Sequence, residues 1–159
     1  MVTPSATAPA SPTEAPPQTP APTTRTTAPP KGETKSLIRD LHPIETDRYP
    51  YDVGPVTVAG KTYPATLTTT CSVATWQLDR KYSTLRTGLA VTETTRSGYT
   101  FVFTVEKDGN EVSTVTREAG DPVLPLTVDV RDAFRVTLRM DSCGEPNGKA
   151  AWIDPVVTG

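Results

Sequence analysis

Four ring-bearing residues outside the most regular strand patterns are the side chains with the clearest potential for ligand chemistry. An exposed aromatic ring offers a flat apolar face on which a ligand can stack, beside a few fixed polar groups that orient it. Tyr49 and Tyr51 lie in a short segment with Pro and Asp, and Tyr99 follows a Ser-Gly pair. Trp76 precedes the residues QLDR and is either a platform or a core residue. We predict ligand contact at these four positions, the alternative for each tyrosine being an ordinary loop residue.

Carboxylates in loops and at strand ends are the second group of interest. Calcium takes six to eight oxygen ligands. The candidates for it are Asp47, Asp52, Asp141, Glu145 and Asp154. No D-x-D-x-D-G loop is present, and the alternative is a set of solvated surface acids. We expect no required cofactor, and the sequence is compatible with a bound structural calcium ion.

Catalytic chemistry has little support in this sequence. The one histidine, His42, precedes Pro43 and is not accompanied by a G-x-S-x-G nucleophile motif. A carboxylate pair can hydrolyse glycosides, but no pair is marked out among the acids. We therefore expect that the chain is not an enzyme.

Charge and hydropathy exclude two classes of partner. The formal net charge is -2, with 16 basic and 18 acidic residues, and no basic stripe suggests nucleic-acid binding. No apolar run reaches the roughly 18 to 20 residues that cross a bilayer. We expect neither a nucleic-acid partner nor membrane contact by this chain itself.

The prolines divide the chain into two parts. Nine of the 17 lie in the first 30 residues, among many Thr and Ala. Such a segment lacks the apolar surface needed to fold, so residues 1–35 are predicted to be a disordered linker or stalk and residues 36–159 the folded domain. Pro/Thr-rich stalks are often extracellular and O-glycosylated. Met1 begins no signal peptide, so we expect an upstream signal or membrane span and tethering at the cell surface.

The folded part reads as short strands separated by turn residues. Residues 101–105 and 111–115 flank Asp108-Gly109, a strong hairpin signal, and residues 56–58 and 61–63 form a second hairpin. Residues 124–130 and 136–140 alternate between apolar and other side chains. About eight or nine strands predict an all-β fold, an antiparallel β-sandwich or jelly roll. Phe101, Phe103 and Trp152 are expected in its core, and residues 36–41 form at most one helical turn.

Two cysteines, Cys71 and Cys143, are widely separated in the chain. In an extracellular setting a single pair is most simply a disulfide, which is worth about 4 kcal/mol for so long a loop. Two unpaired thiols are the alternative. The spacing lacks the C-x-x-C of zinc and redox sites.

Six segments taken in order resemble the NPCBM family of novel putative carbohydrate-binding modules. They are SLIRDLHPIE, PVTVAGKTYPATL, WQLDRKYSTLRTGLAV, FVFTVEKDGNEV, PLTVDVRDAFRVTLRM and AAWIDPVV. No single motif is specific, but their order is, and the resemblance covers about Leu37 to Val157. It implies a β-sandwich of bacterial secreted and surface proteins, sometimes with a structural calcium and, in some relatives, a cysteine pair. Tyr82 matches a framework tyrosine, and Asp154 matches the closing Trp-x-Asp-Pro and is the best calcium candidate.

The resemblance implies a non-catalytic extracellular module that targets a larger secreted or membrane-anchored bacterial protein to a glycan, such as a cell-surface polysaccharide. One departure counts against retained sugar binding. Many members carry Gly-x-His-Ala where residues 67–71 here read LTTTC. The alternative is a surface sensor or interaction domain that binds a protein or cell-wall ligand without free-sugar affinity. The third hypothesis is a purely structural spacer.

Overall fold

The computed structural model describes residues 32–142 and 148–159. The predicted stalk lies outside the described residues as far as residue 31. The described residues form strands and turns without a helix, and so contain no helix of the length and hydrophobicity of a membrane span. The predicted all-β class is confirmed.

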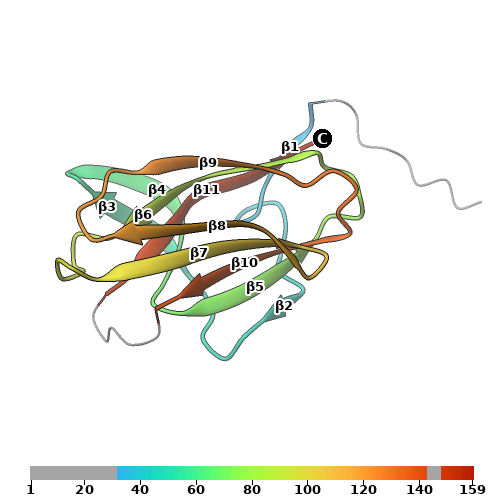
Figure 1. The fold of residues 1–159 in the computed structure, drawn as a ribbon. Coiled ribbons are helices and arrows are strands. Elements are labelled where there is room, and N and C mark those ends of the chain that lie inside the picture. The colour runs from blue at the N-terminus through green and yellow to red at the C-terminus, as the bar shows by residue number, and fades with distance from the viewer. Residues whose placement is uncertain (1–31, 143–147) are drawn as a thin grey trace, which may run out of the picture.

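Eleven strands in the described part of the chain form two antiparallel sheets packed face to face (Figure 1). The first sheet, in the order β3-β4-β11-β6-β9 with β1 also paired to β11, consists of β1 (Thr34–Ser36), β3 (Asp52–Val58), β4 (Lys61–Thr69), β6 (Thr84–Val91), β9 (Leu124–Asp129) and β11 (Ala150–Thr158). The second sheet, in the order β2-β5-β10-β7-β8, consists of β2 (Glu45–Thr46), β5 (Ser72–Gln77), β7 (Thr100–Lys107), β8 (Asn110–Glu118) and β10 (Arg135–Asp141).

The strand count differs slightly from the prediction. The additional strands are β1 and β2, which have three and two residues and are too short to show alternation. β1 begins at Thr34, two residues before the predicted domain boundary. The predicted helical turn is a single turn, in which the Asp40 N–H donates to the Ser36 carbonyl at 3.0 Å.

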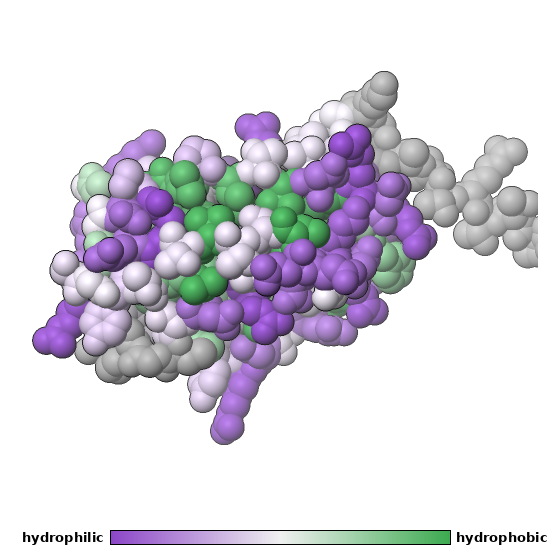
Figure 2. All heavy atoms as spheres, viewed as in Figure 1, coloured by the Kyte–Doolittle hydropathy of each residue, from purple (hydrophilic) through white to green (hydrophobic). Residues whose placement is uncertain are grey.

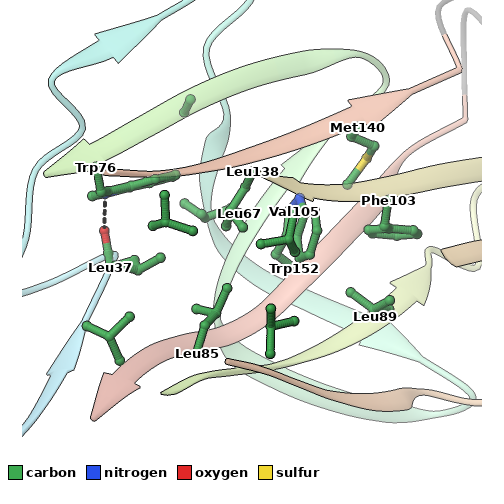
Figure 3. Packing of buried hydrophobic residues seen from close by; sticks show 14 of the residues in the cluster. Leu37, Leu67, Trp76, Leu85, Leu89, Phe103, Val105, Leu138, Met140 and Trp152 are labelled. Carbon is green, nitrogen blue, oxygen red and sulfur yellow. Dashed lines mark hydrogen bonds between the residues drawn. The ribbon is translucent and has the colours of Figure 1, made fainter. Parts of the chain in front are cut away.

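The core lies between the sheets, where alternate residues of each strand meet. Phe103 of the second sheet packs edge-on against Trp152 of the first, with ring centroids 5.0 Å apart and planes at 85°. Figure 3 shows these two rings with the surrounding leucines and Met140. Phe101, Phe103 and Trp152 are all buried, which confirms the prediction for them.

One side of the sandwich is incompletely closed. β8 and β9 are the edge strands of their sheets and lie near each other there, since both line a shallow depression. The half-buried Val115, Leu124 and Leu126 pack against the core along this side. Figure 2 shows apolar side chains in view between polar ones on this face.

The outer face of the first sheet carries a second, smaller apolar cluster. Ala151 and Ile153 of β11 alternate with the core residue Trp152 and therefore point outward. The tip of the β3–β4 hairpin folds over them, and its Val58 and Tyr63 belong to the same cluster. The hairpin thus covers this face and brings its turn to the end of the sandwich where β6 ends.

Close packing at this cluster gives the first prediction. A Cβ on Gly88 would lie 3.0 Å from Val123 Cγ1 and 3.2 Å from Ile153 Cβ. We expect Gly88→Ala to lower the free energy of unfolding by about 1 kcal/mol, because overpacking displaces neighbours that are already in contact. Urea denaturation measures the change. Gly54→Ala, where an added Cβ meets nothing within 4 Å, is the matched control, and equal effects at both glycines would contradict the packing argument.

Candidate functional site

Two cavities of about 400 Å³ each lie side by side at one end of the sandwich, at the left of Figure 1. We call this the loop end, defined by the β3–β4 turn at 59–60, the β6–β7 loop at 92–99, the β8–β9 loop at 119–123 and Lys149. The first cavity lies between the three loops, and the second between β3, the β6–β7 loop and Lys149. Thr92 and Glu93 line both. These volumes lie within the range of small-molecule sites.

Glu93 is one of the two residues that line both cavities. Its Oε1 accepts a hydrogen bond from the Gly60 N–H at 2.7 Å. The turn presents this N–H because Ala59 and Gly60 have φ angles of 49° and 73°, the left-handed pair of a tight hairpin turn. The Glu93 carboxylate therefore holds the hairpin tip in place while its second oxygen remains available to a ligand.

The β6–β7 loop is fixed by a small hydroxyl network. Thr92 Oγ1 lies 2.9 Å from Thr94 Oγ1 and 3.3 Å from Thr95 Oγ1. Thr95 Oγ1 accepts from the Lys149 N–H at 3.0 Å and donates to the Lys149 carbonyl at 3.1 Å. Because these bonds tie the loop to the start of β11, its polar groups are positioned before any ligand arrives.

Further charged groups stand at the rims of the cavities. In the second cavity Lys149 Nζ lies 2.8 Å from Asp52 Oδ2, and both side chains are exposed. In the first cavity Asp121 accepts the Glu118 N–H at 2.9 Å and lies 3.5 Å from Arg117 Nη1. Carboxylates accept hydrogen bonds, an ammonium group donates them and hydroxyls do both, so these groups together can bind a polyhydroxylated ligand.

Trp76 is not a ligand platform. Only 1% of it is exposed, and its Nε1 donates to the Leu37 carbonyl at 3.0 Å, the dashed line in Figure 3. On β5 its side chain points between the sheets, as Ala74 does two residues earlier. Of the residues QLDR that follow it, Gln77 ends the strand and Leu78 is itself buried in the core.

Tyr51 has a structural role rather than the predicted ligand contact. Its hydroxyl lies 3.2 Å from each of the Ser72 and Leu138 carbonyl oxygens, between which it shares its proton, and accepts from Trp152 Nε1 at 3.2 Å. Burial raises the pKa of this phenol well above its usual value. The ring therefore joins the two sheets from inside.

Neither of the remaining two predicted tyrosines lines one of the two cavities. Tyr49 is 62% exposed, and its N–H donates to Asp47 Oδ1 at 3.0 Å. Tyr99 is half-buried, and its carbonyl accepts from the Ala119 N–H at 3.0 Å, which links two loops of the first cavity. Of the four predicted aromatic residues, Tyr99 is the one whose backbone helps to build the site.

Asp154 is exposed, has a φ of 43°, and lies 3.8 Å from Arg39 Nη2. Within residues 32–142 and 148–159, no three Asp, Glu, His or Cys side chains gather closely enough to hold a metal ion. Asp154 thus has no companion ligands among them. Cys71 lies in the turn between β4 and β5, and Cys143 lies outside the described residues, so their pairing stays a prediction.

Three residues that were not among the predicted site residues are central to the two cavities. They are Thr92, Glu93 and Lys149. The signal for Thr92 and Glu93 is the polar run TETTRSG at 92–98, which follows a buried strand and ends at a glycine. That run is a recognisable loop. Its meeting with a hairpin tip from residues 59–60 depends on how the hairpin folds over the sheet, which local sequence does not specify.

Solved structures with a similar fold include CBM51 modules. A second CBM51 module of Clostridium perfringens ZmpB, determined with GlcNAc and INT domains, has a TM-score of 0.67 at 17% identity, covering 80% of this chain and 32% of that one. The CBM51 of Clostridium perfringens GH95, determined with methyl-galactose, has a TM-score of 0.64 at 14% identity, covering 79% of this chain and all of that one.

A longer Clostridium perfringens ZmpB structure, holding the M60 catalytic domain and both CBM51 domains, has a TM-score of 0.65 at 19% identity. It is matched over 80% of this chain and 15% of its own length. At these identities the likeness establishes the fold. No curated protein matches the chain. The model of the NPCBM/NEW2 domain matches residues 28–158, and since this is most of the sequence, the chain belongs to the NPCBM/NEW2 domain family.

Proposed function

We propose that the chain is a non-catalytic carbohydrate-binding module that holds its ligand at the loop end. The observation that carries the proposal is the pair of cavities that Glu93 lines in common, with fixed hydroxyl and charged groups in their walls. Family membership and the fold shared with CBM51 modules support it. A glycan of a cell surface is the ligand that we propose.

We further propose that the module is extracellular and targets a larger secreted or membrane-anchored protein. The Pro/Thr-rich composition of residues 1–30 supports a stalk in that position. The CBM51 modules of ZmpB, which belong to a chain with an M60 catalytic domain, offer a parallel arrangement.

One observation favours the alternative, a surface sensor that binds a protein or cell-wall ligand without free-sugar affinity. None of the described residues that line the two cavities is aromatic. A sugar there would be held by polar groups and by aliphatic walls such as Val53 and Val58, without the stacking energy of a ring. Affinity for a single sugar is therefore expected to be weak.

Substitutions at Glu93 test the proposal. GlcNAc and methyl-galactose are titrated separately into the protein, and binding is followed by NMR. Glu93→Ala is expected to weaken binding at least about tenfold, because it removes a charged acceptor and frees the hairpin tip. Glu93→Gln keeps an oxygen for the Gly60 N–H and is expected to have a smaller effect.

Glu111→Ala is the matched control, since Glu111 is an exposed acid on β8 outside both cavities. If neither sugar binds the parent protein, and a glycan array is also negative, the carbohydrate proposal fails and the sensor alternative is favoured. Equal loss of binding in Glu93→Ala and Glu111→Ala would instead contradict the location of the site.

A further inference from the structure

A depression of about 460 Å³ lies on the outer face of the second sheet, away from the loop end. It is formed by three neighbouring strands, by β2 at the sheet edge and by the β7–β8 turn. Its lining residues are Glu45, Val73, Thr75, Glu106, Asp108, Gly109, Arg135, Thr137 and Arg139.

The alternation of β10 places its polar side chains on this face. Val136, Leu138 and Met140 are fully buried between the sheets, so Arg135, Thr137 and Arg139 point outward. The two arginine side chains keep 45% and 39% of their surface exposed. The outer face of the first sheet is apolar and covered by the β3–β4 hairpin, whereas this face is polar and accessible.

The arginine side chains in the depression form ion pairs with glutamates, but some hydrogen-bonding atoms of the paired groups remain free. Arg139 Nε and Nη2 both donate to Glu106 Oε1, at 3.1 and 2.7 Å, which leaves Nη1 of the arginine and Oε2 of the glutamate outside the pair. Arg135 Nη1 meets Glu45 Oε1 at 3.4 Å. The Asp108 carboxylate accepts hydrogen bonds from the backbone N–H groups of Phe134 and Arg135. Two guanidinium groups face the three carboxylates of Glu45, Glu106 and Asp108, which leaves a small net negative charge, so an anionic ligand is not favoured.

Hydroxyl groups form the floor between the two ion pairs. Thr75 Oγ1 and Thr137 Oγ1 lie 2.8 Å apart, and one donates to the other. The second hydroxyl proton and the remaining lone pairs are left for a further partner. Val73 is the single apolar side chain among the lining residues, so the depression offers no pocket for an apolar peptide side chain.

We infer that this face is a second binding site, which takes a neutral oligosaccharide. Its neighbouring hydrogen-bond donors and acceptors suit vicinal hydroxyls, which both donate and accept, and its small net negative charge disfavours an anionic ligand. The site shares no residue with the loop end, so it stands or falls independently of the binding proposed there.

Residue-resolved NMR titration tests the inference. The probes are the neutral cellotetraose and chitotetraose, with tetragalacturonate as an anionic comparator. At least one neutral probe is expected to shift the amide signals of Thr75, Thr137 and Arg139. Thr137→Val, which replaces the hydroxyl with a methyl group of similar shape, is expected to weaken this binding about three- to tenfold. Arg139→Gln is expected to weaken it about tenfold or more.

Thr114→Val is the matched control, because Thr114 Oγ1 lies 3.4 Å from Thr104 Oγ1 in a similar cross-strand pair outside the depression. It should leave the affinity unchanged. The inference is overturned if both neutral probes leave these amides unshifted, if only tetragalacturonate shifts them, or if Thr114→Val weakens binding as much as Thr137→Val. Binding at this face that persists in Glu93→Ala separates the inference from the fate of the loop-end site.

Discussion

Trp76→Ala is expected to destabilise the domain by about 3–5 kcal/mol, the range for removing a large buried aromatic side chain. The indole is 1% exposed, so its loss leaves a cavity between the sheets. It also leaves the Leu37 carbonyl without the Nε1 donor 3.0 Å away. The free energy of unfolding, obtained from urea titration with an unchanged m-value, measures the effect.

The decisive comparison is with Tyr99→Ala at the half-exposed loop position. We expect that substitution to cost much less stability. Trp76→Phe, which keeps most of the ring volume and loses only the donor and part of the indole, should fall between the two. If Trp76→Ala folded with parental stability and lost ligand binding, the indole would be a platform after all and its buried position would be wrong.

Tyr51→Phe is expected to lower the free energy of unfolding by about 1–3 kcal/mol, even though it removes a single oxygen atom. That oxygen is shared by three partners, the carbonyls of Ser72 and Leu138 and the Nε1 of Trp152, each at 3.2 Å. Without it, buried polar groups from both sheets lose a partner, and the cost is the desolvation of those groups.

Tyr49→Phe provides the matched control for the loss of a phenol hydroxyl, because Tyr49 is 62% exposed. Its effect should remain within about 0.5 kcal/mol. Thermal and urea unfolding of both variants give the comparison. Equal stability of the two variants would show that the Tyr51 hydroxyl is not a junction between the sheets.

Alternation along the strands was enough to predict the sandwich. Residues such as Val136, Leu138 and Met140 repeat with period two, and Asp108-Gly109 locates a hairpin turn, because both signals arise from neighbours in the chain. β1 and β2 were missed because three and two residues carry no period. Their positions are decided by pairing with β11 and β5, which are distant in sequence.

The site could be predicted less well than the fold. The sequence around an aromatic residue is the same whether its ring contacts a ligand or packs in the core. Trp76 and Tyr51 show that these two roles cannot be told apart without knowing which side chains point between the sheets. For Glu93 the local sequence gives no indication of a role in the site. It is an acid in a loop, and it becomes central only because the hairpin tip at Gly60 folds back over the first sheet.

The pairing of β1 with β11 determines how the domain responds to mechanical load. The Gly32 N–H donates to the Gly159 carbonyl at 3.1 Å, and the Gly159 N–H donates to the Glu33 carbonyl at 2.9 Å, so both ends of the folded part lie together, opposite the loop end. Tension between residue 32 and a ligand held at the loop end runs along β1. Because ladder bonds lie across the strands, they share that force in shear.

Pulling residues 32 and 159 away from each other has a different effect. The same bonds then open one after another from the paired ends, as in unzipping. We expect the domain to withstand far greater force along the axis from residues 32 and 159 to the loop end than between those two residues, so its strength depends on the direction of pulling.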